Sequence, residues 1–64
     1  MYDIILTSEN GSQVIVDRFL DAAPAIDAWV ELAVEVKRNN EILRSEGLNI
    51  HCLSGAVFSF VPIR

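Results

Sequence analysis

"AWVELAVEVKRNNEILRSEG", residues 28–47, is the longest continuous helical pattern in this chain of 64 residues. Its apolar residues return every three or four positions, which is the spacing of one helix face. Pro24 is tolerated in a first helical turn, and Gly47 suits the left-handed position at which many helices end. The pattern therefore predicts one helix over residues 24–46, about 34 Å long at a rise of 1.5 Å per residue.

The side chains of this predicted helix divide into a buried face and a solvated face. The buried stripe consists of Ile26, Trp29, Ala33, Val36 and Leu43, with Ala25 and Leu32 at its margin. Asp27, Glu31 and Glu35 recur every four residues on the other side and form an acidic face, which is solvated and also suits contact with a basic partner. Val30 and Val34 lie off the main stripe, so they are more apolar surface than a helix lying on a sheet requires.

A β-hairpin is predicted before the helix. Residues 2–8 and 13–19 are rich in β-branched and aromatic side chains. Asn10 and Gly11 lie between them, and Asn-Gly is a strong hairpin signal because both central positions of a type I′ turn need positive φ.

Two further extended runs follow the helix, at residues 48–54 and 56–64, with a turn near Gly55. Pro62 cannot donate a hydrogen bond to a neighbouring strand, so it either ends the last strand or places it at the sheet edge. A strand order of 2-1-3-4 keeps neighbours antiparallel. We therefore predict a single α+β domain over residues 1–64 in ββαββ order: a four-stranded antiparallel sheet of two hairpins, with one long helix packed on one face.

Composition argues against several classes of function. Nine acidic residues against five basic ones give a net charge of −4, which disfavours binding to nucleic acid. Cys52 is the single cysteine, so no disulfide forms within the chain, and a reducing compartment is expected. The N-terminal residues show neither the basic region of a signal peptide nor an apolar run long enough to span a membrane. We expect a cytoplasmic protein with no membrane partner.

The sequence carries no signature of catalysis, of a metal site or of a cofactor. His51 and Cys52 resemble a nucleophile with its base, but neighbours on a strand point to opposite faces of the sheet. The carboxylates of Asp27, Glu31 and Glu35 have no accompanying ligands that would make a divalent-ion site. We therefore expect no catalytic residue, no metal and no cofactor.

Apolar surface exceeds what one copy of the chain can cover. Hydrophobic residues make up 52% of the sequence, and a domain of this size buries only about 60% of the surface that its unfolded chain exposes. The predicted strands are apolar on both faces, and one helix covers one face. Without a disulfide or a metal, association with another chain is the remaining route to stability. Two-fold dimers are the commonest oligomers, so we expect a homodimer.

Two arrangements of this dimer remain open. Pairing through the uncovered sheet face would bury Ile5 together with Phe58 and Phe60. Pairing through helices would bury Asn40 and Leu43, because a lone Asn at a heptad a position fixes the register of paired helices. With the surplus valines of the helix, the predicted interface residues are Ile5, Phe58, Phe60, Asn40, Leu43, Val30 and Val34.

These observations favour a non-enzymatic protein-binding module: a homodimer that binds and blocks or regulates another protein, as small proteins of phages and mobile elements often do. The alternative is a small structural subunit of a larger protein complex. An independent dimer unfolds cooperatively and in a concentration-dependent way, whereas an isolated subunit of a larger complex unfolds or precipitates when alone.

Overall fold

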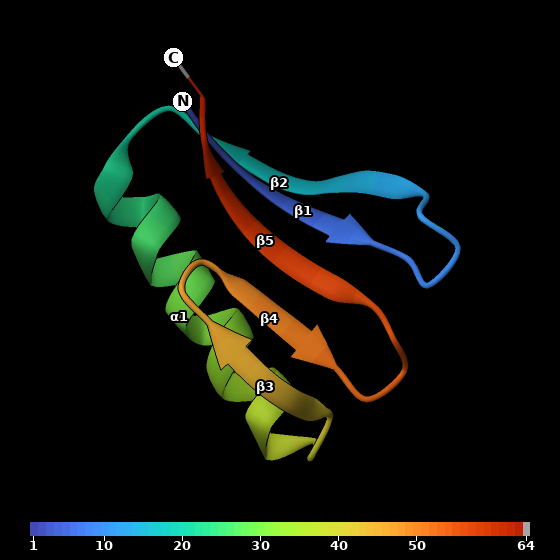
Figure 1. The fold of residues 1–64 in the computed structure, drawn as a ribbon. Helices are drawn as coiled ribbons and strands as arrows, with labels where there is room; N and C mark the ends of the chain where they lie inside the picture. Colours follow the sequence, from blue (N-terminus) through green and yellow to red (C-terminus); the bar gives the residue numbers. More distant parts are fainter. Residues whose placement is uncertain (64) are drawn as a thin grey trace.

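The computed structural model describes residues 1–63, which form one helix packed on one face of an antiparallel sheet (Figure 1). The elements in chain order are β1 (Tyr2–Thr7), β2 (Gln13–Phe19), α1 (Ala22–Arg38), β3 (Ile42–Glu46), β4 (Asn49–Cys52) and β5 (Val57–Pro62). The sheet has five strands in the order β2-β1-β5-β4-β3, and all neighbours are antiparallel. The predicted α+β class is confirmed, but the predicted four strands are wrong.

The predicted helix over residues 24–46 is wrong in its last third. The helix α1 ends at Arg38, and Asn40 then adopts a φ of +55°, a left-handed conformation that Asn tolerates better than most residues. The chain turns back here and residues 42–46 become β3, whose backbone pairs with β4. At 17 residues, α1 spans about 25 Å rather than the predicted 34 Å.

The turns also differ from the predicted ones. Gly47 does not end a helix: Glu46 pairs with Asn49, so Gly47, with a φ of +57°, lies in the two-residue turn between β3 and β4. The hairpin of β1 and β2 is confirmed. Its loop is a five-residue one over residues 8–12, with positive φ at Gly11 alone, rather than a type I′ turn.

The last strand lies in the middle of the sheet, so the predicted strand order is wrong. β5 pairs with β1 on one side and with β4 on the other (Figure 1). Phe58 and Phe60 point to one face while Val57 and Val61 point to the other, and such two-sided apolar strands suit the interior of a sheet. Pro62 ends β5 opposite Tyr2 and does not place it at an edge.

The core lies between α1 and the sheet in two connected clusters. Ile4, Ala25 and Phe60 form the first, and Val36, Ile50 and Cys52 form the second. Trp29 and Leu32 pack against both clusters, and the Trp29 ring lies 5.7 Å from the Phe60 ring. Ala25 is fully buried, because its small side chain lets the start of the helix approach the sheet closely.

Two residues of the predicted buried stripe do not enter the core. Ile26 is 53% exposed on α1, and Leu43 is 63% exposed on β3. The helix therefore faces the sheet with Ala25 at the centre of its contact rather than Ile26. Compared with the predicted orientation, the helix is turned slightly about its axis, and one apolar flank of α1 faces outward.

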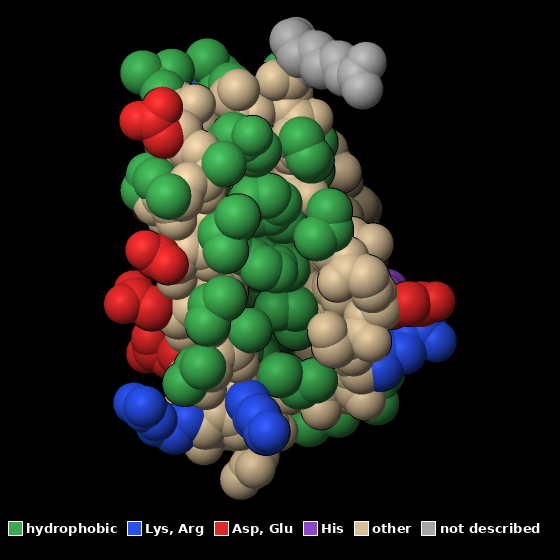
Figure 2. Space-filling model, turned by 90° about the vertical axis from the view of Figure 1, so that its left-hand side faces the viewer, with side chains coloured by type: hydrophobic (Ala, Val, Ile, Leu, Met, Phe, Trp, Pro, Cys, Tyr) green, Lys and Arg blue, Asp and Glu red, His purple; other side chains and the backbone are tan. Residues whose placement is uncertain are grey.

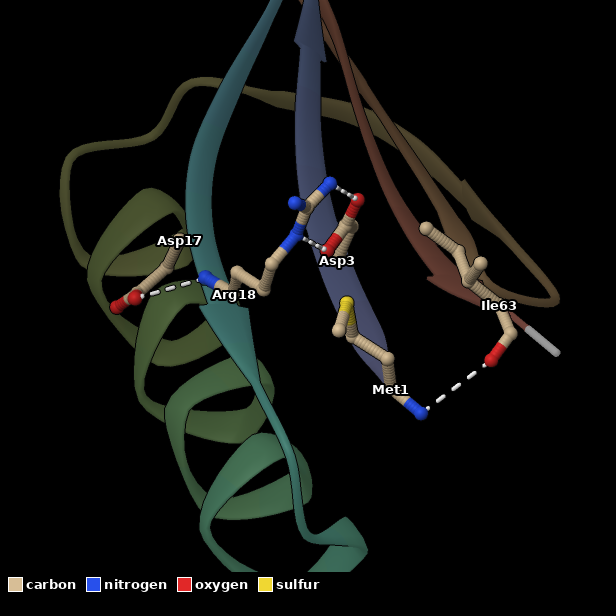
Figure 3. Close-up of polar contacts among 5 residues, drawn as sticks. All are labelled: Met1, Asp3, Asp17, Arg18 and Ile63. Atoms are coloured by element: carbon tan, nitrogen blue, oxygen red, sulfur yellow. Dashed lines mark hydrogen bonds and ion pairs between the residues drawn. The ribbon is translucent and has the colours of Figure 1, made fainter.

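The other face of the sheet is not covered by the helix, and it carries polar pairs. Asp3 on β1 is 1% exposed, and Arg18 on β2 donates to both of its carboxylate oxygens at 2.7 and 2.9 Å (Figure 3). Ser59 donates to the side chain of Asn49 at 2.8 Å on the same face. These polar pairs interrupt the apolar surface that the sequence predicts for this face.

The two ends of the described chain lie side by side. The N-terminal amine of Met1 donates to the carbonyl oxygen of Ile63 at 3.2 Å (Figure 3). The backbone N–H of Ile63 donates in turn to the carbonyl oxygen of Met1 at 2.7 Å.

Candidate interaction surfaces

Many large apolar residues are exposed on the surface of this small protein. Twelve are exposed: Met1, Val14, Ile15, Val16, Leu20, Ile26, Val30, Val34, Leu43, Leu48, Leu53 and Ile63. The chain exposes 4524 Å² in total, whereas a compact monomer of 7.1 kDa exposes about 4,100 Å². The two areas differ by only about a tenth, so the exposed apolar residues rather than the total area distinguish this surface.

The outward flank of α1 carries the most regular of these surfaces. Ile26, Val30 and Val34 follow one another at four-residue spacing, and they are 53%, 53% and 50% exposed. Figure 2 faces the side on which α1 lies and shows a continuous band of apolar side chains, with acidic side chains along one margin and basic ones at its lower end. We call these three residues the helix stripe. The helical spacing predicts the two valines as surplus apolar surface but wrongly predicts Ile26 as part of the buried stripe.

Charged residues border the helix stripe, with acidic residues beside it and basic residues at the C-terminal end of the helix. Asp27, Glu31 and Glu35 are exposed beside it, as predicted for the acidic face. Lys37 and Arg38 occupy the last turn, where the negative end of the helix dipole stabilises their positive charges. A shallow depression of about 290 Å³ is lined by Val30, Glu31, Val34, Glu35 and Arg38. The flank is thus apolar along its length and changes sign of charge towards its C-terminal end.

The edge strand β2 exposes a second apolar segment, consisting of Val14, Ile15 and Val16. Exposed edge strands invite pairing with another strand, and two features here oppose it. An extra residue on β2 breaks the pairing register opposite Ile4 and Ile5, and such bulges bend an edge. The Asp17 carboxylate also accepts the N–H of Arg18 at 2.9 Å, so that backbone donor is already occupied (Figure 3).

A hollow of about 510 Å³ lies at the end of the sheet nearest the helix C-terminus. Its lining consists of Leu6, Glu41, Cys52, Leu53, Ser54, Ala56 and Phe58. Burial raises the pKa of the Cys52 thiol, and the nearby Glu41 carboxylate raises it further. The thiol therefore stays protonated at neutral pH and is a poor nucleophile.

His51 does not assist Cys52. The two residues alternate along β4, where Cys52 is buried beneath the helix and His51 lies on the other face, with Nε2 3.6 Å from the Glu46 carboxylate. Adjacent residues of a strand are expected to point to opposite faces of the sheet, and His51 and Cys52 do so. The pair thus has no shared site at which an acid–base dyad could act.

The predicted interface residues do not form one surface. Ile5 pairs with Ser59 and so faces the open side of the sheet, while Phe58 and Phe60 face the helix, where Phe60 is buried. Grouping these three on one interface is therefore incorrect, because Ile5 lies on the opposite face of the sheet from Phe58 and Phe60. Asn40 lies in a turn and Leu43 on β3, so neither can occupy the heptad position assigned to it. Val30 and Val34 are exposed on the helix stripe.

Within residues 1–63, no three side chains of His, Cys, Asp or Glu lie close enough together to hold a metal ion. In the same part of the chain, no helix has the length and apolar character needed to cross a membrane. No protein-family model, curated protein or solved structure matches this chain.

Proposed function

We propose that this protein is a non-enzymatic protein-binding module that works as a homodimer and blocks or regulates another protein. The observation that carries the proposal is the helix stripe, a row of exposed apolar side chains on one flank of the helix. Contiguous apolar patches on small soluble proteins mark interaction sites more often than they mark idle surface.

The chemistry of the remaining groups supports a binding role over catalysis. The Cys52 thiol is buried and protonated, and His51 lies on the opposite face of the sheet. The best-formed polar contact, between Asp3 and Arg18, is a closed ion pair whose donors and acceptors already satisfy each other. Cys52 lines the hollow beside Glu41, but its protonated thiol is a poor nucleophile there.

Charge indicates which kind of protein the dimer binds. The net charge is −4, and Asp27, Glu31 and Glu35 form one exposed row on the side of α1 next to the helix stripe. Complementary charge speeds encounter and selects partners. A protein with a basic surface is therefore the partner class that fits.

Sedimentation equilibrium up to about 1 mM protein tests the proposal. We expect a mass that rises from one chain to two, together with a midpoint of thermal unfolding that rises with protein concentration. A single-chain mass throughout this range, with a concentration-independent midpoint, contradicts the homodimer. Precipitation or non-cooperative unfolding of the isolated chain instead favours a subunit of a larger complex.

A further inference from the structure

We propose that the hollow at the end of the sheet binds a small apolar amine. The hydrocarbon part of the amine enters the hollow, and its ammonium group stays at the mouth beside Glu41. The inference goes beyond the proposed function and does not depend on the homodimer.

The hollow lies where the helix stops covering its side of the sheet. Leu6 and Phe58 lie opposite each other on the helix side, as Ile4 and Phe60 do two residues away along the same strands. Ile4 and Phe60 are buried beneath α1, whereas Leu6 lies outside both core clusters of residues 1–63. The volume of about 510 Å³ falls within the roughly 300–1,000 Å³ of small-molecule sites.

The hollow has an apolar floor and a polar mouth. Four of its lining residues are buried or half-buried: Leu6, Cys52, Ala56 and Phe58. Glu41, Leu53 and Ser54 also line it but are exposed, which places them at the mouth. A ligand therefore meets carbon atoms and a protonated thiol at the floor, and a carboxylate where it leaves the protein.

Glu41 holds this carboxylate in a defined place. Its backbone N–H donates to the carbonyl oxygen of Val36 at 3.1 Å, and its own carbonyl oxygen accepts the N–H of Leu53 at 2.8 Å. Within residues 1–63, no cationic side chain forms an ion pair with it. Burial is the main cause of the raised pKa of the Cys52 thiol and the charge of Glu41 adds to it, so the field of this carboxylate reaches the floor.

A second carboxylate lies near the same mouth. The side chain of Glu9 lies against Gly55, because a methyl group added at Gly55 would come within 3.2 Å of the Glu9 Cγ atom. Gly55 lies between Ser54 and Ala56, which both line the hollow. The mouth is thus negative, which favours a cation and disfavours an anion.

The change from a buried floor to an exposed mouth sets the orientation of the ligand. A cation carried to the floor would lose its water without gaining a partner. A lysine or arginine side chain of another protein would enter charge first, so it fits poorly. An amine with its charge at one end buries its hydrocarbon part and keeps the ammonium group near Glu41.

Three probes that share a phenethyl group measure the contribution of charge: phenethylammonium, phenethyl alcohol and phenylpropanoate. Shifts of the amide NMR signals of the full chain give the Kd of each probe and locate its site. We expect phenethylammonium to bind with a millimolar Kd, about three- to five-fold more tightly than the alcohol, which is the contribution of one exposed ion pair. Phenylpropanoate should bind most weakly. The shifts should be largest at Leu6 and over residues 52–58.

Matched substitutions test the role of Glu41. Glu41→Gln and Glu31→Gln each remove one exposed carboxylate, but Glu41 lines the hollow and Glu31 lies on α1. Glu41→Gln should remove the preference for the amine over the alcohol, whereas Glu31→Gln should retain it. Leu53→Ala at the mouth should weaken all three probes alike, by about two-fold or more, because apolar contact is lost. Circular dichroism checks that the variants remain folded.

Each contrary outcome identifies the step that fails. Equal binding of the three probes, or a preference for the amine that survives Glu41→Gln, overturns the role of the carboxylate. Failure of phenethylammonium to bind at about 50 mM, or shifts centred on the helix stripe, overturns the site itself. Neither result bears on the homodimer, which sedimentation equilibrium tests separately.

Discussion

Replacing Leu43 with alanine separates the observed strand β3 from the helix that the sequence pattern favours. In a helix over residues 24–46, Leu43 would belong to the buried stripe, and Leu→Ala in a core costs about 2–5 kcal/mol. In the structure Leu43 is 63% exposed on β3. Burying a whole Leu side chain is worth about 1.5–3 kcal/mol, and little more than a third of this one is buried, so Leu43→Ala should cost about 1 kcal/mol or less.

Ile50 supplies the comparison, because it is 2% exposed in the core cluster with Val36 and Cys52. We expect Ile50→Ala to lower the free energy of unfolding by about 2–5 kcal/mol, a large part of the roughly 3–10 kcal/mol typical of a chain of this length. Urea unfolding followed by circular dichroism measures both variants at one protein concentration. Ile50→Val, at about 0.5–1.5 kcal/mol, serves if the alanine variant lacks a folded baseline. Equal costs for Leu43→Ala and Ile50→Ala would place residue 43 inside the core and refute the strand.

Three other expectations follow from single residues. The hydrogen bond from Arg18 lowers the pKa of Asp3 below its ordinary 3.8, so the pair stabilises the fold above that pH and loses its contribution as the pH falls through the lowered pKa. The urea midpoint of the Asp3→Asn variant should therefore depend less on pH below about 4 than the midpoint of the unmodified chain. An identical pH dependence of the two midpoints would contradict this. Gly47→Ala should cost about 1–2 kcal/mol in the same urea assay, because φ is +57° there although the space around it is open; an unchanged stability would show that the turn adopts another conformation. Cys52 should react slowly with a thiol reagent at neutral pH and rapidly in urea, whereas equal rates would show that the thiol is not buried.

Local signals in the sequence were sufficient for the first hairpin and the start of the helix. Residues 2–8 and 13–19 are rich in β-branched and aromatic side chains, and Asn10 and Gly11 mark a turn between them. Tyr2 pairs with Phe19, so the contact of Asp3 with Arg18 follows from the same register. The signal for the Asp3–Arg18 pair is therefore present in the sequence, as opposite charges at two positions that the hairpin places opposite each other, although the prediction above did not include it.

The end of the helix could not be decided locally. The segment ILRSE, residues 42–46, continues the helical spacing of the stripe and also suits a short strand. Pairing with β4 across the two-residue turn, in which Arg44 lies opposite His51, decides between them, and structural context of this kind overrides intrinsic propensity. Ala25 and Ile26 present the same problem on a smaller scale, because they lie 100° apart on the helix and only the contact with the sheet selects the buried one.

The central position of β5 has a consequence for biosynthesis. As the chain emerges from the ribosome, the hairpin of β1 and β2 and the hairpin of β3 and β4 have no strand between them until residues 57–62 appear. Before that moment β1 and β4 each leave one backbone edge open, and the two halves of the core have no common strand on which to assemble. Productive folding therefore waits for the last strand, and a nascent chain stalled before Val57 presents two open edges to its neighbours.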